Sequence, residues 1–166
     1  MEIEDAKRIA AGIALSFLIL HLSPAEACRC NTEGAAFVHL ARNATLVVQG
    51  TVETQAERGA IQVRISRVLK GSLDRPGEPI KIWGDDGHLC RPYVSTFPRG
   101  TEWVFVLANR SFGGFPQRPG PRDYWISICG AHWVRVEGNR VSGRIRDAAT
   151  EEAMSVDHLL KLLGKS

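Results

Sequence analysis

Four cysteines restrict the fold of this chain, because all of them follow an apolar N-terminal stretch that is typical of exported proteins. Residues 9–22 are almost entirely apolar. They are too few to span a bilayer, where about 20 residues are needed, but they suit the core of a signal peptide. Ala25 and Ala27 then supply the small residues of a signal-peptidase site. The sequence therefore predicts a signal peptide over residues 1–27, a mature chain that begins at Cys28, and a secreted or periplasmic protein.

Lipid attachment to Cys28 is an alternative, because this cysteine follows the predicted cleavage site directly. Lipoprotein signals usually carry leucine three residues before the cysteine, and this chain has Ala25 there. The difference favours soluble export, so no membrane contact is expected after the signal peptide is cleaved.

The mature chain is moderately basic and long enough for one domain. The predicted signal peptide holds two of the 21 basic and four of the 18 acidic side chains, which leaves 19 and 14 and a net charge of +5. Nucleic-acid-binding proteins usually carry a denser basic stripe, so we expect no nucleic acid among the partners. The remaining 139 residues suffice for one core but hardly for two domains. We expect a monomer with a single domain over residues 28–166.

An oxidising compartment predicts that the four cysteines form two disulfides. A bridge between Cys28 and Cys30 is disfavoured, because a one-residue gap rarely permits disulfide geometry. Two long-range bridges to Cys90 and Cys129 remain, in either pairing, and each would stabilise the fold by on the order of 4 kcal/mol in the loop-entropy model. A four-cysteine zinc site is the competing interpretation, but structural zinc sites favour close pairs with longer spacers than this one.

Short segments rich in β-branched residues, separated by turn residues, dominate the mature chain. Their alternation predicts strands over residues 45–55, 60–69, 79–83, 102–107 and 123–129, and a hairpin over residues 133–145. Gly50 lies inside the first strand and predicts a bulge where that strand bends. The four tryptophans all fall within these strands and are interpreted mainly as core residues. The pattern predicts an all-β barrel or sandwich.

Two short helices complete the prediction. The first covers residues 32–41, with Thr32 as its N-cap. The second is amphipathic and lies near the end of the sequence, where Ser155 caps it and Gly164 ends it.

No catalytic motif stands out in the sequence. It lacks H-E-x-x-H, G-x-S-x-G and a phosphate-binding loop, so we expect neither an enzyme nor a cofactor. Asp85 and Asp86 are interpreted as part of a solvated turn, because a calcium loop needs more carboxylates at regular spacing. Asn43 and Asn109 begin glycosylation sequons that matter only in a eukaryotic secretory route.

Several features together resemble the N-terminal domain of the tissue inhibitors of metalloproteinases (TIMPs), which belongs to the netrin-like group. These features are the strand order, Cys28-Arg29-Cys30 at the mature terminus, Leu89-Cys90 in the third inter-strand loop, and the segment Trp125–Cys129. The resemblance covers most of residues 28–130 and the final helix. It implies a five- to six-stranded OB-type Greek-key barrel with a short N-terminal helix and a C-terminal amphipathic helix. It also implies the disulfides Cys28–Cys90 and Cys30–Cys129.

The resemblance implies inhibition of a zinc metalloprotease by the mature N-terminus. The backbone amine and carbonyl of Cys28 would bind the catalytic zinc of the target, and Arg29 would enter its primed-side pocket. The flanking protease contacts implied are Cys30, Asn31, Thr32, His88, Leu89 and Cys90. Zinc in such enzymes keeps an open coordination position, and an α-amino pKa of about 8 makes the neutral amine accessible near neutral pH.

This chain also departs from the family. It lacks a third disulfide and the six-cysteine C-terminal domain, and so resembles the bacterial TIMP-like proteins. Arg29 replaces the usual small residue, and a cation enters an apolar pocket poorly. A non-inhibitory netrin-like module that binds an extracellular protein or polyanion is the main alternative. An oligosaccharide-binding or nucleic-acid-binding OB protein is a third, which requires aromatic side chains displayed on the barrel face.

Overall fold

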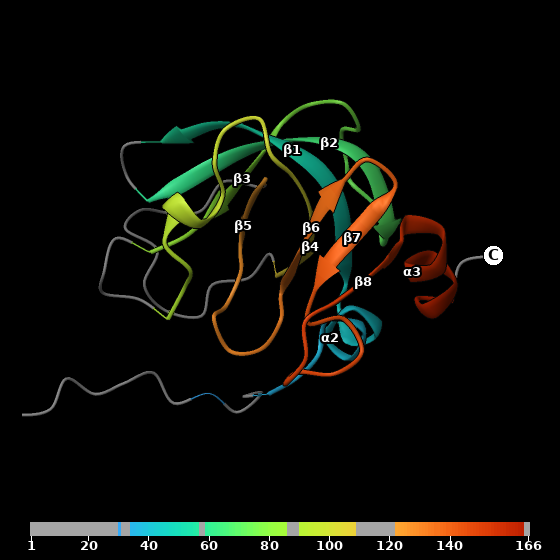
Figure 1. Cartoon of the computed structure of the whole chain (residues 1–166). Coiled ribbons are helices and arrows are strands. Elements are labelled where there is room, and N and C mark those ends of the chain that lie inside the picture. Colours follow the sequence, from blue (N-terminus) through green and yellow to red (C-terminus); the bar gives the residue numbers. More distant parts are fainter. Residues whose placement is uncertain (1–29, 31–33, 57–58, 86–89, 109–121, 165–166) are drawn as a thin grey trace, which may run out of the picture.

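Among the residues that it describes, a computed structural model shows one curled β-sheet with two short α-helices beside it (Figure 1). It describes residues 30, 34–56, 59–85, 90–108 and 122–164. The elements in chain order are α2 (Phe37–Asn43), β1 (Leu46–Ala56), β2 (Ala60–Lys70), β3 (Ile80–Trp83), the 3-10 helix η1 (Val94–Thr96), β4 (Glu102–Leu107), β5 (Asp123–Trp125), β6 (Trp133–Glu137), β7 (Arg140–Gly143), β8 (Glu152–Ser155) and α3 (Val156–Leu162). In the described ranges no helix is both long and apolar enough to cross a bilayer.

The sheet is mostly antiparallel and has the strand order β5-β3-β2-β1-β4-β6-β7-β8. The exception is the pair β3 and β5, whose strands run parallel. Ala108, just beyond β4, forms an isolated antiparallel bridge with Trp125 of β5. Its N–H donates to the Trp125 carbonyl at 3.2 Å, and the reverse bond measures 3.0 Å. The first five strands of this order therefore curl until the edge strand β5 meets the end of β4.

The all-β class is confirmed, but the sheet has eight strands among the described residues, whereas five to six were expected. The predicted strand over residues 123–129 stops at Trp125, because the following residues turn away to a disulfide at Cys129. The sequence does not predict β8, because no alternation of apolar and polar residues marks this segment. In the structure only Met154 of its four residues is buried. Pairing with β7 makes it a strand.

Gly50 lies at the bulge that the sequence predicts. The register between β1 and β2 shifts between Gln49 and Gly50. A Cβ atom on Gly50 would lie 2.6 Å from the carbonyl oxygen of Arg64 and 2.7 Å from a methyl carbon of Val63. Glycine is therefore needed here for the close approach of β2, and not for an unusual backbone angle.

β4 is the strand that separates two hydrophobic cores. Val104 and Val106 lie in a core with α2, α3 and β6–β8. Trp103, Phe105 and Leu107 lie on the opposite face, in a core with β1–β3 and β5. Every residue of β4 after Glu102 is consequently buried, although a strand with one solvated face would alternate.

The two helices differ in how well the sequence predicts them. The N-cap of α2 is Ala36, which makes no side-chain capping bond, so the prediction of Thr32 as the cap is wrong. The helix begins later because Phe37 and Val38 donate their N–H groups to the carbonyls of Arg144 and Ile145. In α3 the Ser155 hydroxyl accepts the N–H of His158 at 3.1 Å, which confirms the predicted cap.

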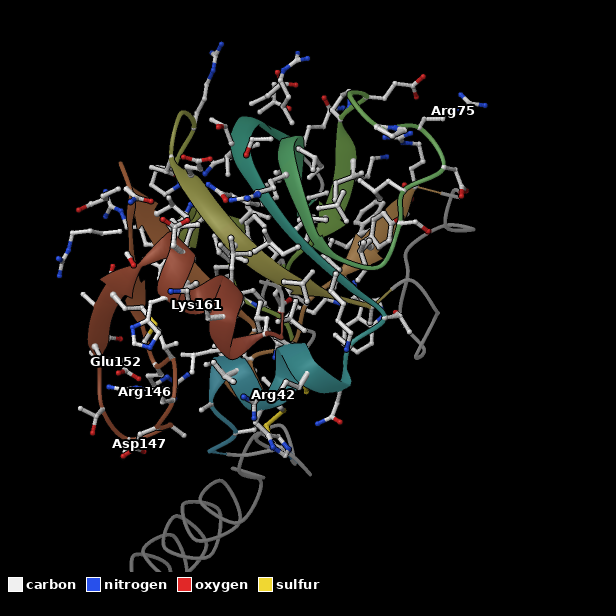
Figure 2. All side chains as sticks on the ribbon, turned by 90° about the vertical axis from the view of Figure 1, so that its right-hand side faces the viewer. Arg42, Arg75, Arg146, Asp147, Glu152 and Lys161 are labelled. Carbon is white, nitrogen blue, oxygen red and sulfur yellow. A yellow bond between two sulfur atoms is a disulfide. The ribbon has the colours of Figure 1, made fainter. Side chains whose placement is uncertain are left out.

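α2 and α3 lie side by side over the core that β4 shares with β6–β8 (Figure 2). Arg42 of α2 donates from Nε at 3.0 Å and from Nη2 at 2.8 Å to the carbonyl of Leu162, the last residue of α3. A cation at this end also complements the negative end of the helix dipole. The contact joins two helices that lie 120 residues apart in the sequence.

Candidate functional site

Two of the predicted protease-contacting residues, Cys30 and Cys90, belong to the described part of the chain. The other six lie outside the described residues: Cys28, Arg29, Asn31, Thr32, His88 and Leu89. The signal peptide predicted over residues 1–27 and the sequon at Asn109 also lie outside them.

Cys30 and Cys129 form a disulfide, with their Cα atoms 5.2 Å apart. The bridge joins positions 99 residues apart and ties the segment before α2 to the segment after β5. This pairing is the one that the resemblance implied, and it is confirmed. Cys90 is also disulfide-bonded, but its predicted pairing with Cys28 stays a prediction because Cys28 lies outside the described residues.

Cys90 lies close to this disulfide through its backbone. Its carbonyl accepts the N–H of Ile128 at 3.3 Å, and Ile128 directly precedes Cys129. The structure thus brings together three cysteines that are far apart in the sequence, namely Cys30, Cys90 and Cys129. We call this cluster, with Ile128, the cysteine ridge.

The segment that follows Cys90 is anchored in the protein. Arg91 is only 6% exposed, and its guanidinium carbon lies 5.9 Å from the centroid of the Trp125 ring. The carbonyl of Pro92 accepts the N–H of Asp85 at 2.9 Å. A Cβ atom on Gly84 would lie 2.7 Å from that same carbonyl, so glycine permits the close approach. These contacts hold one side of the cysteine ridge in a defined position.

The interpretation of Asp85 as part of a solvated turn is wrong. Asp85 is 7% exposed, and its backbone forms an isolated β-bridge with Tyr93. The sequence did not signal this burial, because Asp85 is covered by residues that follow it in the next segment of the chain. Asp86 lies outside the described residues.

Two large apolar side chains are exposed in the described part of the chain, Tyr93 at 59% and Ile128 at 43%. Ile128 belongs to the cysteine ridge, and Tyr93 follows Cys90 by three residues. Neither residue was singled out from the sequence.

The tryptophans are mostly core residues, as interpreted. Trp83 and Trp103 are each 8% exposed, and their indole N–H groups donate to Asp123 at 3.1 Å and to Thr101 at 2.7 Å. Trp125 and Trp133 are half-buried.

A cavity of about 660 Å³ lies between the end of α2, the end of β4 and the residues after β5. His132 lines it, together with Leu40, Ala44, Leu107 and Trp125. Burial lowers the pKa of His132 to about 4, and its buried Nδ1 has no hydrogen-bond partner among the described residues. The imidazole is therefore neutral near pH 7. The sequence offered no signal for this environment, because the cavity forms only when four separate segments meet.

The described residues contain no group of three or more histidine, cysteine or acidic side chains placed to hold a metal ion. The competing four-cysteine zinc site is contradicted by the disulfide between Cys30 and Cys129.

No protein-family model matches this chain, and no curated protein matches it either.

Proposed function

We propose that this protein is a secreted or periplasmic TIMP-like inhibitor of a zinc metalloprotease, acting through a mature N-terminus at Cys28. The observation that carries the proposal is the cysteine ridge. The disulfide between Cys30 and Cys129 and the bond from Ile128 N–H to the Cys90 carbonyl bring two predicted protease-contacting segments together. A preorganised backbone of this kind loses little entropy when it binds.

An OB-type barrel is part of the same proposal. Its support is the parallel pairing of β3 with β5, together with the bridge between Ala108 and Trp125 that links β5 to the end of β4. With β1 paired to both β2 and β4, these contacts would bring five strands into the arrangement of a small barrel. The strands β6, β7 and β8 would then extend the barrel on one side.

The proposed chemistry uses backbone groups of Cys28. Its amine and carbonyl would occupy the open position of the protease zinc, and Arg29 would fill the adjacent specificity pocket. Because a guanidinium is costly to bury without a partner, the preferred target is a protease whose pocket carries an acidic side chain.

The test compares mature protein beginning at Cys28 with a variant that carries one additional alanine before Cys28. Mass spectrometry first verifies both N-termini and the predicted bridge from Cys28 to Cys90. Inhibition is then measured against a panel of zinc metalloproteases with acidic and with apolar primed-side pockets. We expect the added alanine to weaken inhibition by about 100-fold or more, since it removes the chelating amine.

A variant with one alanine added after Ser166 is the matched control and should inhibit as the parent does. Equal inhibition by the two N-terminal forms would contradict the zinc-chelating mechanism. Binding that ignores residue 28 but weakens with salt would instead identify the non-inhibitory module.

A further inference from the structure

A second concave surface lies between β4, β6 and β7, away from the residues of the cysteine ridge. It has a volume of about 320 Å³, at the lower end of the range for small-molecule sites. Its lining combines aromatic, basic, acidic and hydroxyl side chains: Trp103, Trp133, Arg135, Ser142, Arg144 and Glu151. We call it the Trp133 groove.

Several polar side chains of the Trp133 groove have no bonding partner within the described part of the chain. Arg144 is half-buried, yet its guanidinium makes no hydrogen bond or ion pair there. The same holds for the half-buried Ser142 hydroxyl and Trp133 indole N–H, and for the Glu151 carboxylate, which is exposed at the border of the groove. Buried or half-buried polar groups are usually satisfied within a protein, so a group of this kind needs an explanation.

A nearby ion pair provides a contrast to Arg144. Arg146, two residues after Arg144, contacts the Glu152 carboxylate from Nε at 2.7 Å, and that carboxylate also accepts the Arg146 backbone N–H at 2.6 Å. Arg144 and Glu151 border the same groove but form no such pair. A cation and an anion held apart across a concave surface leave space for a ligand that contacts both.

The aromatic side of the groove is rigid. Phe97 packs against Trp133 edge to face, with ring centroids 5.5 Å apart and planes at 84°. Phe97 packs in the same manner on Trp103 at 5.2 Å. Trp103 is buried, so the half-buried Trp133 ring supplies the accessible apolar surface, against which the C–H face of a sugar ring can pack without ordering cost.

We propose that the Trp133 groove binds an oligosaccharide that carries carboxylate groups. Arg144 donates hydrogen bonds to a sugar carboxylate, a geometry that guanidinium groups favour. Glu151 and Ser142 bond to sugar hydroxyls, and Trp133 packs against the ring. The proposal is independent of protease inhibition, because the groove and the cysteine ridge share no residue.

The test is calorimetric titration of the protein with tetragalacturonate, and with neutral maltotetraose as the comparison ligand. We expect tetragalacturonate to bind and maltotetraose to bind at least about tenfold more weakly. Arg144→Gln should weaken tetragalacturonate binding by about tenfold or more, since it removes the charged donor.

Arg67→Gln is the matched control, because Arg67 is an exposed arginine of β2 and the substitution removes the same charge away from the groove. It should leave the affinity unchanged. The circular dichroism and melting temperature of both variants are measured to verify folding. Absence of tetragalacturonate binding, equal binding of the neutral ligand, or equal loss in the two arginine variants would each overturn the proposal.

Discussion

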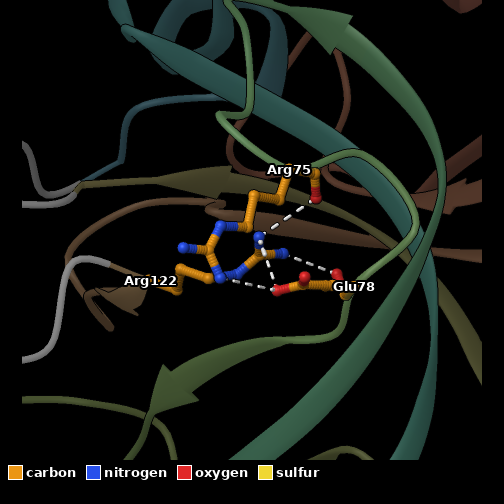
Figure 3. Close-up of polar contacts among 3 residues, drawn as sticks. All are labelled: Arg75, Glu78 and Arg122. Carbon is orange, nitrogen blue, oxygen red and sulfur yellow. Dashed lines mark hydrogen bonds and ion pairs between the residues drawn. The ribbon is translucent and has the colours of Figure 1, made fainter.

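Arg122 donates a hydrogen bond from Nη2 to the backbone carbonyl of Glu78 at 2.7 Å, and its Nη1 lies 3.3 Å from the carboxylate of the same residue (Figure 3). Nη1 also donates to the carbonyl of Arg75 at 3.0 Å. The contacts join the turn before β3 to the start of β5. These two strands form the parallel pair at one edge of the sheet.

We predict that Arg122→Met lowers the free energy of unfolding by about 1–3 kcal/mol, because it removes charged hydrogen bonds from a mostly buried side chain. Arg75→Met is the matched control: Arg75 contacts the same carboxylate at 3.7 Å, but its side chain is 70% exposed. Its effect should be within about 0.5 kcal/mol, as expected for surface pairs. Urea denaturation measures both, and equal effects would contradict a special role for Arg122.

The disulfide between Cys30 and Cys129 closes a loop of 99 residues. Its removal in the double variant Cys30→Ser, Cys129→Ser should lower the free energy of unfolding by about 4 kcal/mol, chiefly because the unfolded chain gains entropy. The measurement is urea denaturation without reductant, with a mass check that Cys90 remains bridged. A loss below about 1 kcal/mol would show that the unfolded chain is already restricted without this bridge.

His132 makes stability depend on pH. Its pKa is about 4 in the folded protein and about 6.5 in the unfolded chain, so the unfolded state binds more protons between these values. The free energy of unfolding should therefore fall as the pH falls from about 6.5 to 4, by on the order of 3 kcal/mol from this residue.

His132→Gln should flatten that part of the pH profile relative to the parent chain, as measured by urea denaturation at a series of pH values. His39→Gln is the control, because His39 is exposed on α2. If the His132→Gln profile ran parallel to the parent profile, burial of His132 would not be the cause of the pH dependence.

Gly50→Ala should destabilise the protein by about 2 kcal/mol or more, because the added methyl overlaps the Arg64 carbonyl and Val63. Gly100→Ala is a useful contrast: its φ is +81°, but no atom lies within 4 Å of the added Cβ. That variant should lose only about 1 kcal/mol, through backbone strain alone. Thermal unfolding of the two variants compares them, and a similar loss in both would argue against a steric origin at Gly50.

The sequence by itself determined the elements whose signals are local. The strand at Glu102–Leu107 is observed with the predicted bounds, and the hairpin turns at Gly138 as expected. The Ser155 cap and the bulge at Gly50 are also confirmed, because capping and side-chain alternation depend on neighbouring residues. The pairing of Cys30 with Cys129 was implied by resemblance, since spacing left two pairings open.

Tertiary structure alone decided the features that depend on distant segments. β5 is short because Trp125 pairs with Ala108 and the chain then turns to Cys129. Asp85 is buried beside Pro92 and Tyr93 of the next segment, and burial among distant segments keeps His132 neutral near pH 7. The Trp133 groove exists only where β4, β6 and β7 meet. Burial and electrostatic environment are properties of such long-range packing, and no local pattern of residues encodes them.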